Sequence, residues 1–412
     1  MNLAQVLEKA WPPALWGLVR GAGERAWSRG LRLYLVGGAV RDLLLERPSL
    51  DLDLVVEGDA LALLPDLGWQ GRLRRFPTFG TAKLLGEGWS LDLASARKES
   101  YPRPGALPRV GPGTLQDDLF RRDFAINALA VDLSPPSLGG LVDPFGGRQD
   151  LEKGLVRVLH ERSFQDDATR ILRAIKYAAR FGFRLEARTR KLILRDKGYL
   201  ETISGERLRR ELVLILEEDM PERALALAGR LGIMGEISPG LAGDGWLGRK
   251  FSLARRQVWA SPEVYLALLA YRMAPEEARA FLSRLHFPRA QARAIEDIQA
   301  LKAQEKVLAP PRLAPYQVCR LLAGYSGPAV QALALASPEA RIRRRARLFW
   351  EEWRYVKCSL GGEDLLGMGV EAGPRVGEYL RRLLEARLDG VVGDRAGEEE
   401  LVLRWLSSGS AR

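Results

Sequence analysis

The stretch LVGGAVRD at residues 35–42 decides how the N-terminal part of this chain folds. Residues 33–36 form an apolar run that predicts a strand, and the residues after the two glycines predict a helix. Gly37 and Gly38 allow a tight turn and let a ligand come close to the backbone. The free N–H groups of a helix start attract phosphate, and Arg41 adds a forked cation there. Without further evidence, a Gly-Gly pair is more often an ordinary strand-to-helix turn.

Two acids in the next apolar run favour a functional site. Residues 50–56 predict a strand, so Asp51 and Asp53 should share one face of it. Carboxylates that lie so close repel each other unless a cation separates them, and Mg²⁺ fits such a pair and bridges to substrate phosphates. Asp92 lies in another strand-like run, residues 89–94, where it would complete a two-metal site or act as a base. The alternative is a half-exposed strand with solvated acids.

Five sequence blocks, in order over about the first half of the chain, carry a family resemblance. They are residues 35–53, RRDFAINALA at 121–130, DPFGG at 143–147, DDATR at 166–170 and ERLRREL at 206–212. Together they resemble the motifs of bacterial-class (class II) tRNA nucleotidyltransferases, which are the CCA-adding enzymes and the relatives of bacterial poly(A) polymerase.

The resemblance implies a role for each matching position. Asp51 and Asp53 would hold Mg²⁺ in a two-metal mechanism, with Asp92 as the third catalytic acid, while other residues would bind the incoming nucleotide. The nucleotide-binding residues would be Gly37, Gly38, Arg41, Arg122, Asp123, Asp167, Arg170 and Arg173. Among them, Asp167 and Arg170 would read the base.

Chemistry supports Asp167 and Arg170 as a base-reading pair. A helix through residues 171–181, capped by Ser163 or Asp166, would place the two side chains on one face. A carboxylate can accept from the exocyclic amine of cytosine or adenine, and a guanidinium can donate to the neighbouring acceptor. Uracil and guanine do not offer that arrangement. The alternative is a salt bridge in the first turn of the helix.

Residues 97–113 are dense in Gly and Pro and predict a mobile surface loop. In the resembled family, a loop at this place is linked to the switch from C addition to A addition, and enzymes that add only C tend to lack it. Its full length here favours an enzyme that adds A, alone or after two Cs. A plain connecting loop is the alternative.

Composition agrees with a protein that binds RNA. The 412 residues include 63 Lys+Arg and 52 Asp+Glu, a formal net charge of +11, which suits a polyanionic partner. The two cysteines, Cys319 and Cys358, and the two histidines give no spacing typical of a zinc site. No apolar run is long enough to span a membrane, and we expect a cytoplasmic protein.

The predicted fold is an α+β nucleotidyltransferase head, with a small mixed β-sheet and helices, followed by all-α domains. The expected domains are a catalytic head at residues 1–154, a base-recognising neck at 155–225, a body at 226–310 and a tRNA-binding tail at 311–412. In the tail, residues 341–347 are strongly basic, and Arg341, Arg344 and Arg345 are candidate RNA contacts. A solvated helical face is the alternative.

The expected activity is template-independent addition or repair of the 3′-terminal CCA of tRNA from CTP and ATP, with release of pyrophosphate. The partner would be the acceptor stem and 3′ end of tRNA. A partial enzyme that adds only A, or only CC, would imply a second nucleotidyltransferase as partner. A poly(A) polymerase and a binding module without catalysis are the remaining alternatives, and the sequence leaves the oligomeric state open.

Overall fold

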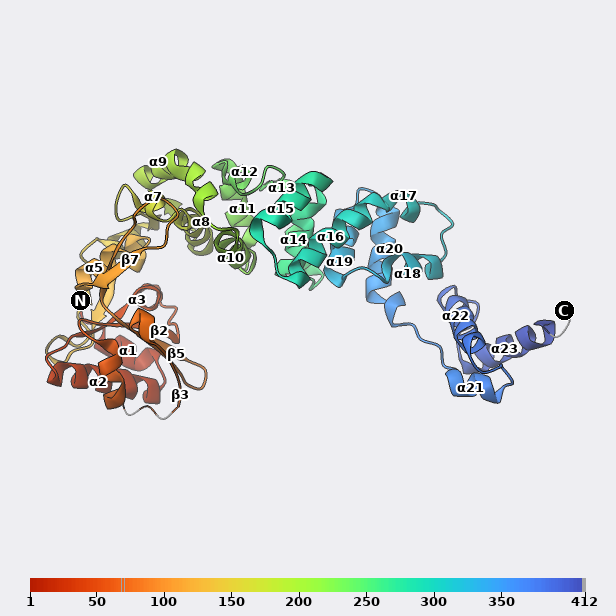
Figure 1. Cartoon of the computed structure of the whole chain (residues 1–412), viewed down its shortest axis with the longest axis horizontal. Coiled ribbons are helices and arrows are strands. Elements are labelled where there is room, and N and C mark those ends of the chain that lie inside the picture. Colours follow the sequence, from red (N-terminus) through yellow and green to blue (C-terminus); the bar gives the residue numbers. More distant parts are fainter. Residues whose placement is uncertain (68, 70, 410–412) are drawn as a thin grey trace. The chain divides into compact units, whose positions relative to one another are not determined.

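The computed structural model describes residues 1–67, 69 and 71–409 (Figure 1). The chain divides into two compact units, Met1–Ile237 and Ser238–Arg412. Each unit has a buried apolar cluster of its own. The domain boundaries expected at residues 154, 225 and 310 stay predictions.

A seven-stranded mixed sheet forms the centre of the first unit, with strand order β3-β4-β5-β2-β1-β8-β9. Its strands are β1 (Leu33–Val36), β2 (Asp51–Val56), β3 (Arg72–Phe76), β4 (Thr81–Leu85), β5 (Ser90–Ser95), β8 (Ala130–Asp132) and β9 (Leu141–Val142). β2 and β5 run parallel, whereas β1–β2, β4–β5 and β3–β4 are antiparallel. This confirms the predicted small mixed sheet.

The apolar runs form strands because their alternate side chains fill the core. In β2, Leu52 and Leu54 are buried, while Asp51 and Asp53 point to the other face of the sheet. All four residues of β1 are buried. The turn that follows β1 leads directly into α3 (Gly38–Leu44), as the glycine pair predicts.

Helices flank the sheet in the first unit. They are α1 (Ala4–Ala10), α2 (Pro13–Ser28), α3, α4 (Ala60–Leu63), α5 (Leu115–Phe120) and α6 (Gly147–Lys153). α2 packs against β1, and α3 packs against both β1 and β2. The contact with β1 and β2 fixes α3 beside the strand that carries the two acids.

The segment expected as a surface loop is largely a hairpin. β6 (Arg97–Ser100) pairs antiparallel with β7 (Arg109–Pro112), so that Glu99 lies opposite Val110. The loop prediction is therefore wrong for both flanks of residues 97–113 and holds only for the connection between them. Cross-strand pairing between residues nine or more positions apart is invisible in local Gly and Pro content.

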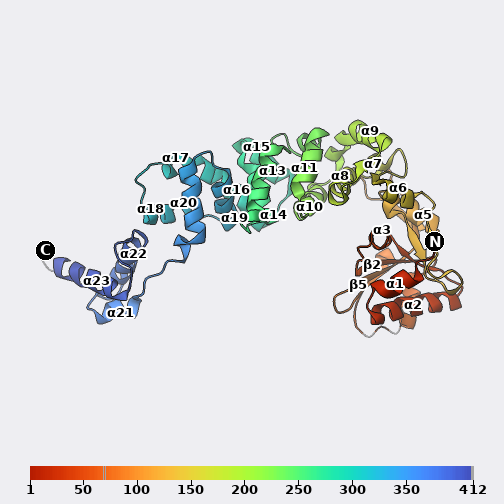
Figure 2. The same ribbon diagram turned by 180° about the vertical axis from the view of Figure 1, so that it is seen from behind.

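A bundle of helices completes the first unit. It contains α7 (Ser163–Asp166), α8 (Thr169–Phe181), α9 (Ala187–Asp196), α10 (Gly205–Leu216), α11 (Pro221–Arg230) and α12 (Ile233–Ile237). A short parallel pair, β10 (Leu155–Val156) with β11 (Arg184–Leu185), lies beside α8. Viewed from behind in Figure 2, α8 and α10 again lie side by side, consistent with their packing contacts.

The start of α8 differs from the prediction. Neither Ser163 nor Asp166 caps this helix, because both belong to the separate short helix α7. α8 begins at Thr169 without a side-chain cap, and Asp167 has an extended backbone with φ of −146° between the two helices. Asp167 therefore does not belong to the first turn of α8.

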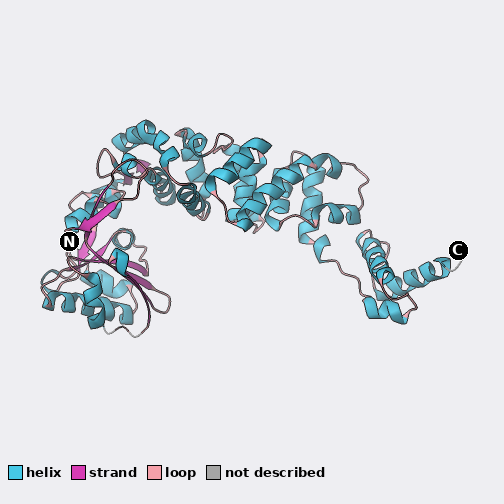
Figure 3. Cartoon of the chain, viewed as in Figure 1, coloured by secondary structure: helices cyan, strands magenta, loops and turns pink. Residues whose placement is uncertain are grey.

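Among its described residues, the second unit has helices and connecting loops but no strand, as Figure 3 shows by the confinement of strands to the N-terminal part. Its helices are α13 (Gly245–Arg256), α14 (Pro262–Tyr271), α15 (Pro275–Leu285), α16 (Arg289–Ala303), α17 (Glu305–Leu308), α18 (Pro315–Leu322), α19 (Gly327–Ala336), α20 (Ala340–Glu351), α21 (Gly362–Gly367), α22 (Pro374–Leu388) and α23 (Arg395–Gly409). The predicted fold class, an α+β head followed by helical domains, is confirmed. In the described part of the chain, no helix combines the length and apolar character needed to cross a membrane.

Candidate active site

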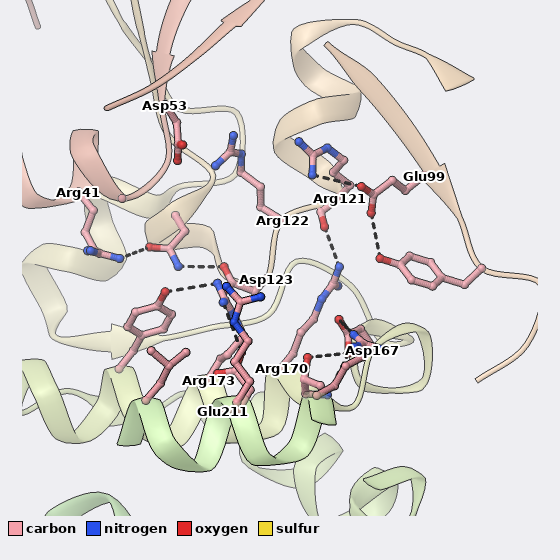
Figure 4. Close-up of a pocket in the computed structure, with 18 residues that line it drawn as sticks. Arg41, Asp53, Glu99, Arg121, Arg122, Asp123, Asp167, Arg170, Arg173 and Glu211 are labelled. Atoms are coloured by element: carbon pink, nitrogen blue, oxygen red, sulfur yellow. Dashed lines mark hydrogen bonds and ion pairs between the residues drawn. The ribbon is translucent and has the colours of Figure 1, made fainter. Parts of the chain in front are cut away.

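A cavity of about 570 Å³ lies within the first unit, between the sheet and the helices α8 and α10 (Figure 4). Its lining is dominated by charged side chains, with more arginines than acids. The arginines are Arg41, Arg121, Arg122, Arg170, Arg173, Arg207 and Arg210, and the acids are Asp53, Glu99, Asp123, Asp167 and Glu211. A cavity of this size and positive charge fits a nucleoside triphosphate.

Gly37 makes the turn into α3 possible for two physical reasons. Its φ of +75° lies in the region that side chains disfavour. A Cβ at this position would also come within 2.3 Å of Nη1 of Arg122. The glycine thus gives the Arg122 guanidinium its place beside Asp53, while the next residue, Gly38, lines the cavity.

Arg41 lines the same cavity but is already firmly held. Its guanidinium is buried, donates to Oδ1 of Asn127 at 2.6 Å and forms two hydrogen bonds with the Asp42 carboxylate. The rings of Tyr177 and Phe181 lie 5.2 and 4.9 Å from its central carbon. Contact with a triphosphate stays a prediction for this residue.

The three predicted catalytic acids lie on one face of two neighbouring strands. Asp53 on β2 is in register with Asp92 on β5, and Asp51 lies two residues before Asp53 on the same face. The Ser90 hydroxyl donates to the Asp51 carboxylate. Burial raises the pKa of Asp53; the charge of Arg122 opposes this shift, and the neighbouring Asp92 and Asp51 add to it.

Lys83 joins this group of acids, although no local sequence pattern predicts it. It lies on β4 directly opposite Asp92, and its Nζ is 2.8 Å from Oδ2 of Asp92 and 3.8 Å from Oδ1 of Asp51. The hydrogen bond with Asp92 raises the pKa of Lys83 despite partial desolvation. Only the register of β4 against β5 reveals this contact.

The acids suit a magnesium ion that shares its coordination with substrate. Among the described residues, no group of three or more acidic, histidine or cysteine side chains is gathered closely enough to hold a metal ion. Mg²⁺ commonly takes only one or two protein carboxylates and completes its shell with water and substrate phosphates. The mutual repulsion that contributes to the raised pKa of Asp53 is the condition that such a cation relieves.

Asp123 binds Arg173 rather than pointing freely into the cavity. Its Oδ2 accepts hydrogen bonds from Nε and Nη2 of Arg173 at 2.8 and 2.6 Å, and its Oδ1 accepts from Asn127. Burial pushes the pKa of Asp123 upward, but the charge of Arg173 and the hydrogen bonds from Asn127 and Arg173 outweigh it and lower the pKa. In this geometry, Asp123 positions Arg173, whose own pKa is raised mainly by the carboxylate.

The neighbouring Arg122 has one hydrogen-bond donor without a partner among the described atoms. Its Nη2 binds the buried Asp118 at 3.1 Å, but its Nε is buried and has no hydrogen-bond partner among the described atoms. An unpaired buried donor is costly unless a ligand satisfies it. Arg122 lines the cavity together with Asp53 and opposes the raised pKa of that acid, so its guanidinium fits an anionic ligand.

The predicted base-reading residues both line the cavity without pairing with each other. Asp167 accepts from the backbone N–H and hydroxyl of Thr169 and, at 2.8 Å, from Nη2 of Arg207. Arg170 instead donates to the Ser163 hydroxyl at 2.9 Å and to the carbonyl of Arg121 at 2.7 Å. The salt bridge within one helical turn, the alternative considered above, is absent among the described contacts of these two residues.

The hairpin contributes two residues to the cavity that the sequence did not single out. Glu99 accepts hydrogen bonds from Arg97, from Nη1 of Arg121 at 3.3 Å and from the Tyr101 hydroxyl at 2.9 Å. Burial raises the pKa of Tyr101 to about 12. Glu99 thereby ties the hairpin to the block that contains Arg122 and Asp123.

The tail arginines have different environments in the second unit. Arg345 is buried and donates to the carbonyls of Leu308, Pro311 and Leu313 at 2.6, 3.2 and 3.3 Å. The structure gives it a packing role in place of the predicted RNA contact. Arg341 donates to one carbonyl and Arg344 is exposed, so for these two the RNA contact stays a prediction.

Two family models match the chain. Residues 33–157 match the model described as "Poly A polymerase head domain", and residues 182–244 match "Probable RNA and SrmB- binding site of polymerase A". The first match contains β1, β2 and the RRDF block, and the second contains α10.

Similar proteins extend the match over nearly the whole chain. The CC-adding tRNA nucleotidyltransferase of Deinococcus radiodurans is 34% identical over 92% of this chain and 93% of its own length. The chain belongs to the tRNA nucleotidyltransferase family. An A-adding member from Geobacter sulfurreducens is 31% identical over 99% of this chain but only 49% of its own length. The chain thus spans about half the length of the A-adding family members that it matches.

A solved structure of the family also shares the fold. The Thermotoga maritima CCA-adding enzyme, in complex with a tRNA, superposes with a TM-score of 0.79 at 32% identity, covering 98% of this chain and 99% of that one. Over most of the chain, members named for adding A, CC and CCA are 31%, 34% and 32% identical to it, so these matches do not select among the three activities.

Proposed function

We propose that this chain adds or repairs the 3′-terminal CCA of tRNA, using CTP and ATP. The observation that carries this proposal is the cavity itself, which has Asp53 in its lining together with both Asp167 and Arg170. One pocket thereby contains an acid that would hold Mg²⁺ and a pair of groups that would recognise a base. The family relationship to A-adding, CC-adding and CCA-adding members supports the same class of reaction.

In the proposed reaction, the 3′-hydroxyl of the RNA attacks the α-phosphorus of the nucleotide. A new phosphodiester bond forms, the bond to the β-phosphate oxygen breaks, and pyrophosphate leaves. Asp51 and Asp53 would hold Mg²⁺, which lowers the pKa of the attacking hydroxyl and offsets charge on the leaving pyrophosphate. The guanidinium of Arg122 would donate to the phosphates, and Asp92 lies on the next strand as a further acceptor.

Base selection would follow from how rigidly Asp167 and Arg170 are held. Arg207 and Thr169 orient the Asp167 carboxylate, while Ser163 and the carbonyl of Arg121 orient Arg170. Because neither residue neutralises the other, both keep hydrogen-bonding capacity for a base. An acceptor and a donor so arranged suit the amine and adjacent acceptor shared by cytosine and adenine.

The partner would be the acceptor stem and 3′ end of tRNA, with Arg341 and Arg344 as candidate contacts in the second unit. A partial enzyme that adds only A, or only CC, is the second candidate, and it would work beside another nucleotidyltransferase. The full-length segment at residues 97–113, which forms the hairpin of β6 and β7, favours a member that adds A, as the family resemblance implies.

The test uses three tRNA transcripts that end at the discriminator base, at C and at CC. Each is incubated with magnesium and with CTP, ATP or both, and products are sized to one nucleotide. Completion of CCA on the shortest transcript, followed by a stop, is the expected result. Growth of only the CC-ended transcript with ATP would show an A-adding enzyme, CC without A would contradict our reading of the hairpin, and long A tracts would show a poly(A) polymerase.

A further inference from the structure

The sheet presents a row of charged residues that extends from the catalytic acids to its edge. Asp53 on β2 lies beside Asp92 on β5, Asp92 beside Lys83 on β4, and Lys83 beside Arg74 on the edge strand β3. Residues paired directly across strands share a face, so all four side chains lie on the same side of the sheet. With neighbouring strands roughly 4.8 Å apart, the backbone of Arg74 lies about 15 Å from β2.

A second row runs parallel to the first on the same face. It joins Asp51, Ser90, Leu85 and Arg72 through the same strand pairs. Arg72 and Arg74 are exposed, and neither side chain has a hydrogen bond or ion pair within the described residues. Phe76, two residues further along this face, is 43% exposed. The edge strand thus shows two available guanidinium groups and one aromatic ring on the face that carries the acids.

The nucleotide cavity lies on the other side of the acids. Its lining residues come from β2, α3, the hairpin, the RRDF block, the link before α8, α8 and α10, and none comes from β3, β4 or β5. Asp53 therefore stands between the cavity and the half of the sheet that carries Lys83 and Arg74.

The geometry of phosphoryl transfer indicates how the half of the sheet formed by β5, β4 and β3 could contact the RNA. Attacking and leaving oxygens lie roughly in line on opposite sides of the reacting phosphorus. With the leaving pyrophosphate in the cavity and the α-phosphorus at Asp53, the RNA hydroxyl would approach from the opposite side, where β5, β4 and β3 lie. The phosphates that precede this hydroxyl would then cross the rows that end at Arg72 and Arg74.

We propose that Arg72 and Arg74, with the ring of Phe76, form a track that holds the single-stranded 3′ end of the RNA. This inference rests on the proposed function and specifies where its RNA substrate lies. The arginines would bind phosphates, and Phe76 would stack on a base without selecting it. The RNA end so held would present its hydroxyl at Asp51 and Asp53.

Charged edge strands also prevent sheets from joining edge to edge, which is the competing explanation. Preventing edge-to-edge pairing requires charged side chains on the edge strand, but they can lie on either face of the sheet. Arg75 offers the matched control, because it is exposed on the same strand and points to the opposite face, in register with Ala82 and Leu93. If the track exists, Arg74 contributes to RNA binding and Arg75 does not.

The experiment measures equilibrium binding of two tRNA transcripts without nucleotide or magnesium. One transcript ends in CC, and the other lacks the single-stranded 3′ end. R74A should weaken binding of the CC-ended transcript by roughly fivefold and R72A/R74A by more than tenfold, with the salt dependence reduced by about 0.7 per arginine. On the truncated transcript, the same variants should change binding less than twofold, as should R75A on either.

Three outcomes would overturn the track. They are equal losses for R74A and R75A, equal losses on both transcripts, and unchanged binding by R72A/R74A. A lysine variant, R72K/R74K, keeps the charge and should recover most of the affinity, which separates loss of contact from loss of folding. If the wild-type protein extends no RNA, the proposed function fails, whereas the binding comparison still decides whether the track exists.

Discussion

Nη2 of Arg207 donates a hydrogen bond to Oδ2 of Asp167 at 2.8 Å, although 40 positions separate the two residues in the sequence. Asp167 lies in the extended link before α8, and Arg207 reaches it from α10. The carboxylate is thereby oriented by a residue outside its own motif, while Arg170, three positions away, is bound elsewhere.

Replacing Arg207 should damage base selection more than folding. R207A would leave Asp167 free to rotate, and we expect kcat/KM for ATP to fall about 30-fold, with relative incorporation of U and G rising. The measurement is single-nucleotide extension with each of the four nucleotides. R188A, which removes an exposed ion pair with Glu161, serves as control and should change neither quantity. Unchanged selectivity in R207A would show that Asp167 needs no orienting partner.

Gly37 should not tolerate even alanine. G37A adds a Cβ at φ of +75° and 2.3 Å from Nη1 of Arg122, so strain of about 1–3 kcal/mol and displacement of Arg122 are expected. Activity should fall by more than tenfold and the melting temperature should drop. G17A, in the middle of α2 with open space around its Cβ, should be neutral or slightly stabilising. If G37A behaved like G17A, the proposed packing at the turn would be incorrect.

Asp123 should contribute stability that is lost in acid. Its pKa is lowered in the folded protein from an ordinary value of 3.8, so its contribution is complete above that value and disappears as the pH falls through the folded pKa. At pH 7, D123N should cost about 3 kcal/mol because Arg173 loses its charged partner. Denaturant unfolding between pH 2 and 7 checks this. The difference in unfolding free energy between wild type and D123N should shrink below about pH 4. A difference that stays constant with pH would contradict a stabilising charge on Asp123.

Lys83 competes with any cation for Asp92 and Asp51. K83M would remove a charge 2.8 Å from Asp92, so binding of Mn²⁺, used as a spectroscopic probe for magnesium, should tighten by roughly fivefold. Electron paramagnetic resonance titration of free Mn²⁺ measures this without turnover. Weaker Mn²⁺ binding in K83M would mean instead that Lys83 organises the acids for the metal.

Alanine substitutions of two adjacent arginines of α20 should have opposite effects on stability and on tRNA binding. R345A leaves three carbonyls without their donor and should lower the unfolding free energy by about 2 kcal/mol. R344A removes an exposed side chain and should leave stability within about 0.5 kcal/mol, while weakening tRNA binding. Thermal unfolding and tRNA binding of both variants check the pair. A stable R345A, or an R344A that binds tRNA normally, would contradict these roles.

The elements that the sequence predicted depend on local pattern. Apolar runs gave β1, β2 and β5, and the alternation around Asp51 and Asp53 placed both acids on one face. Contacts between distant segments could not be read this way. Lys83 meets Asp92 through the register of β4, and the hairpin forms through pairs such as Glu99 with Val110. The link before α8 was missed because Ser163 and Asp166 are good capping residues, yet they belong to a separate short helix.

The most direct test of the central claim is extension of a CC-ended tRNA with each single nucleotide in turn, in the presence of magnesium. The proposed function predicts addition of one A, no detectable U or G, and loss of addition in D53A with the fold retained. Addition of all four bases at similar rates, or full activity of D53A, would contradict the claim that one cavity both selects the nucleotide and activates its transfer.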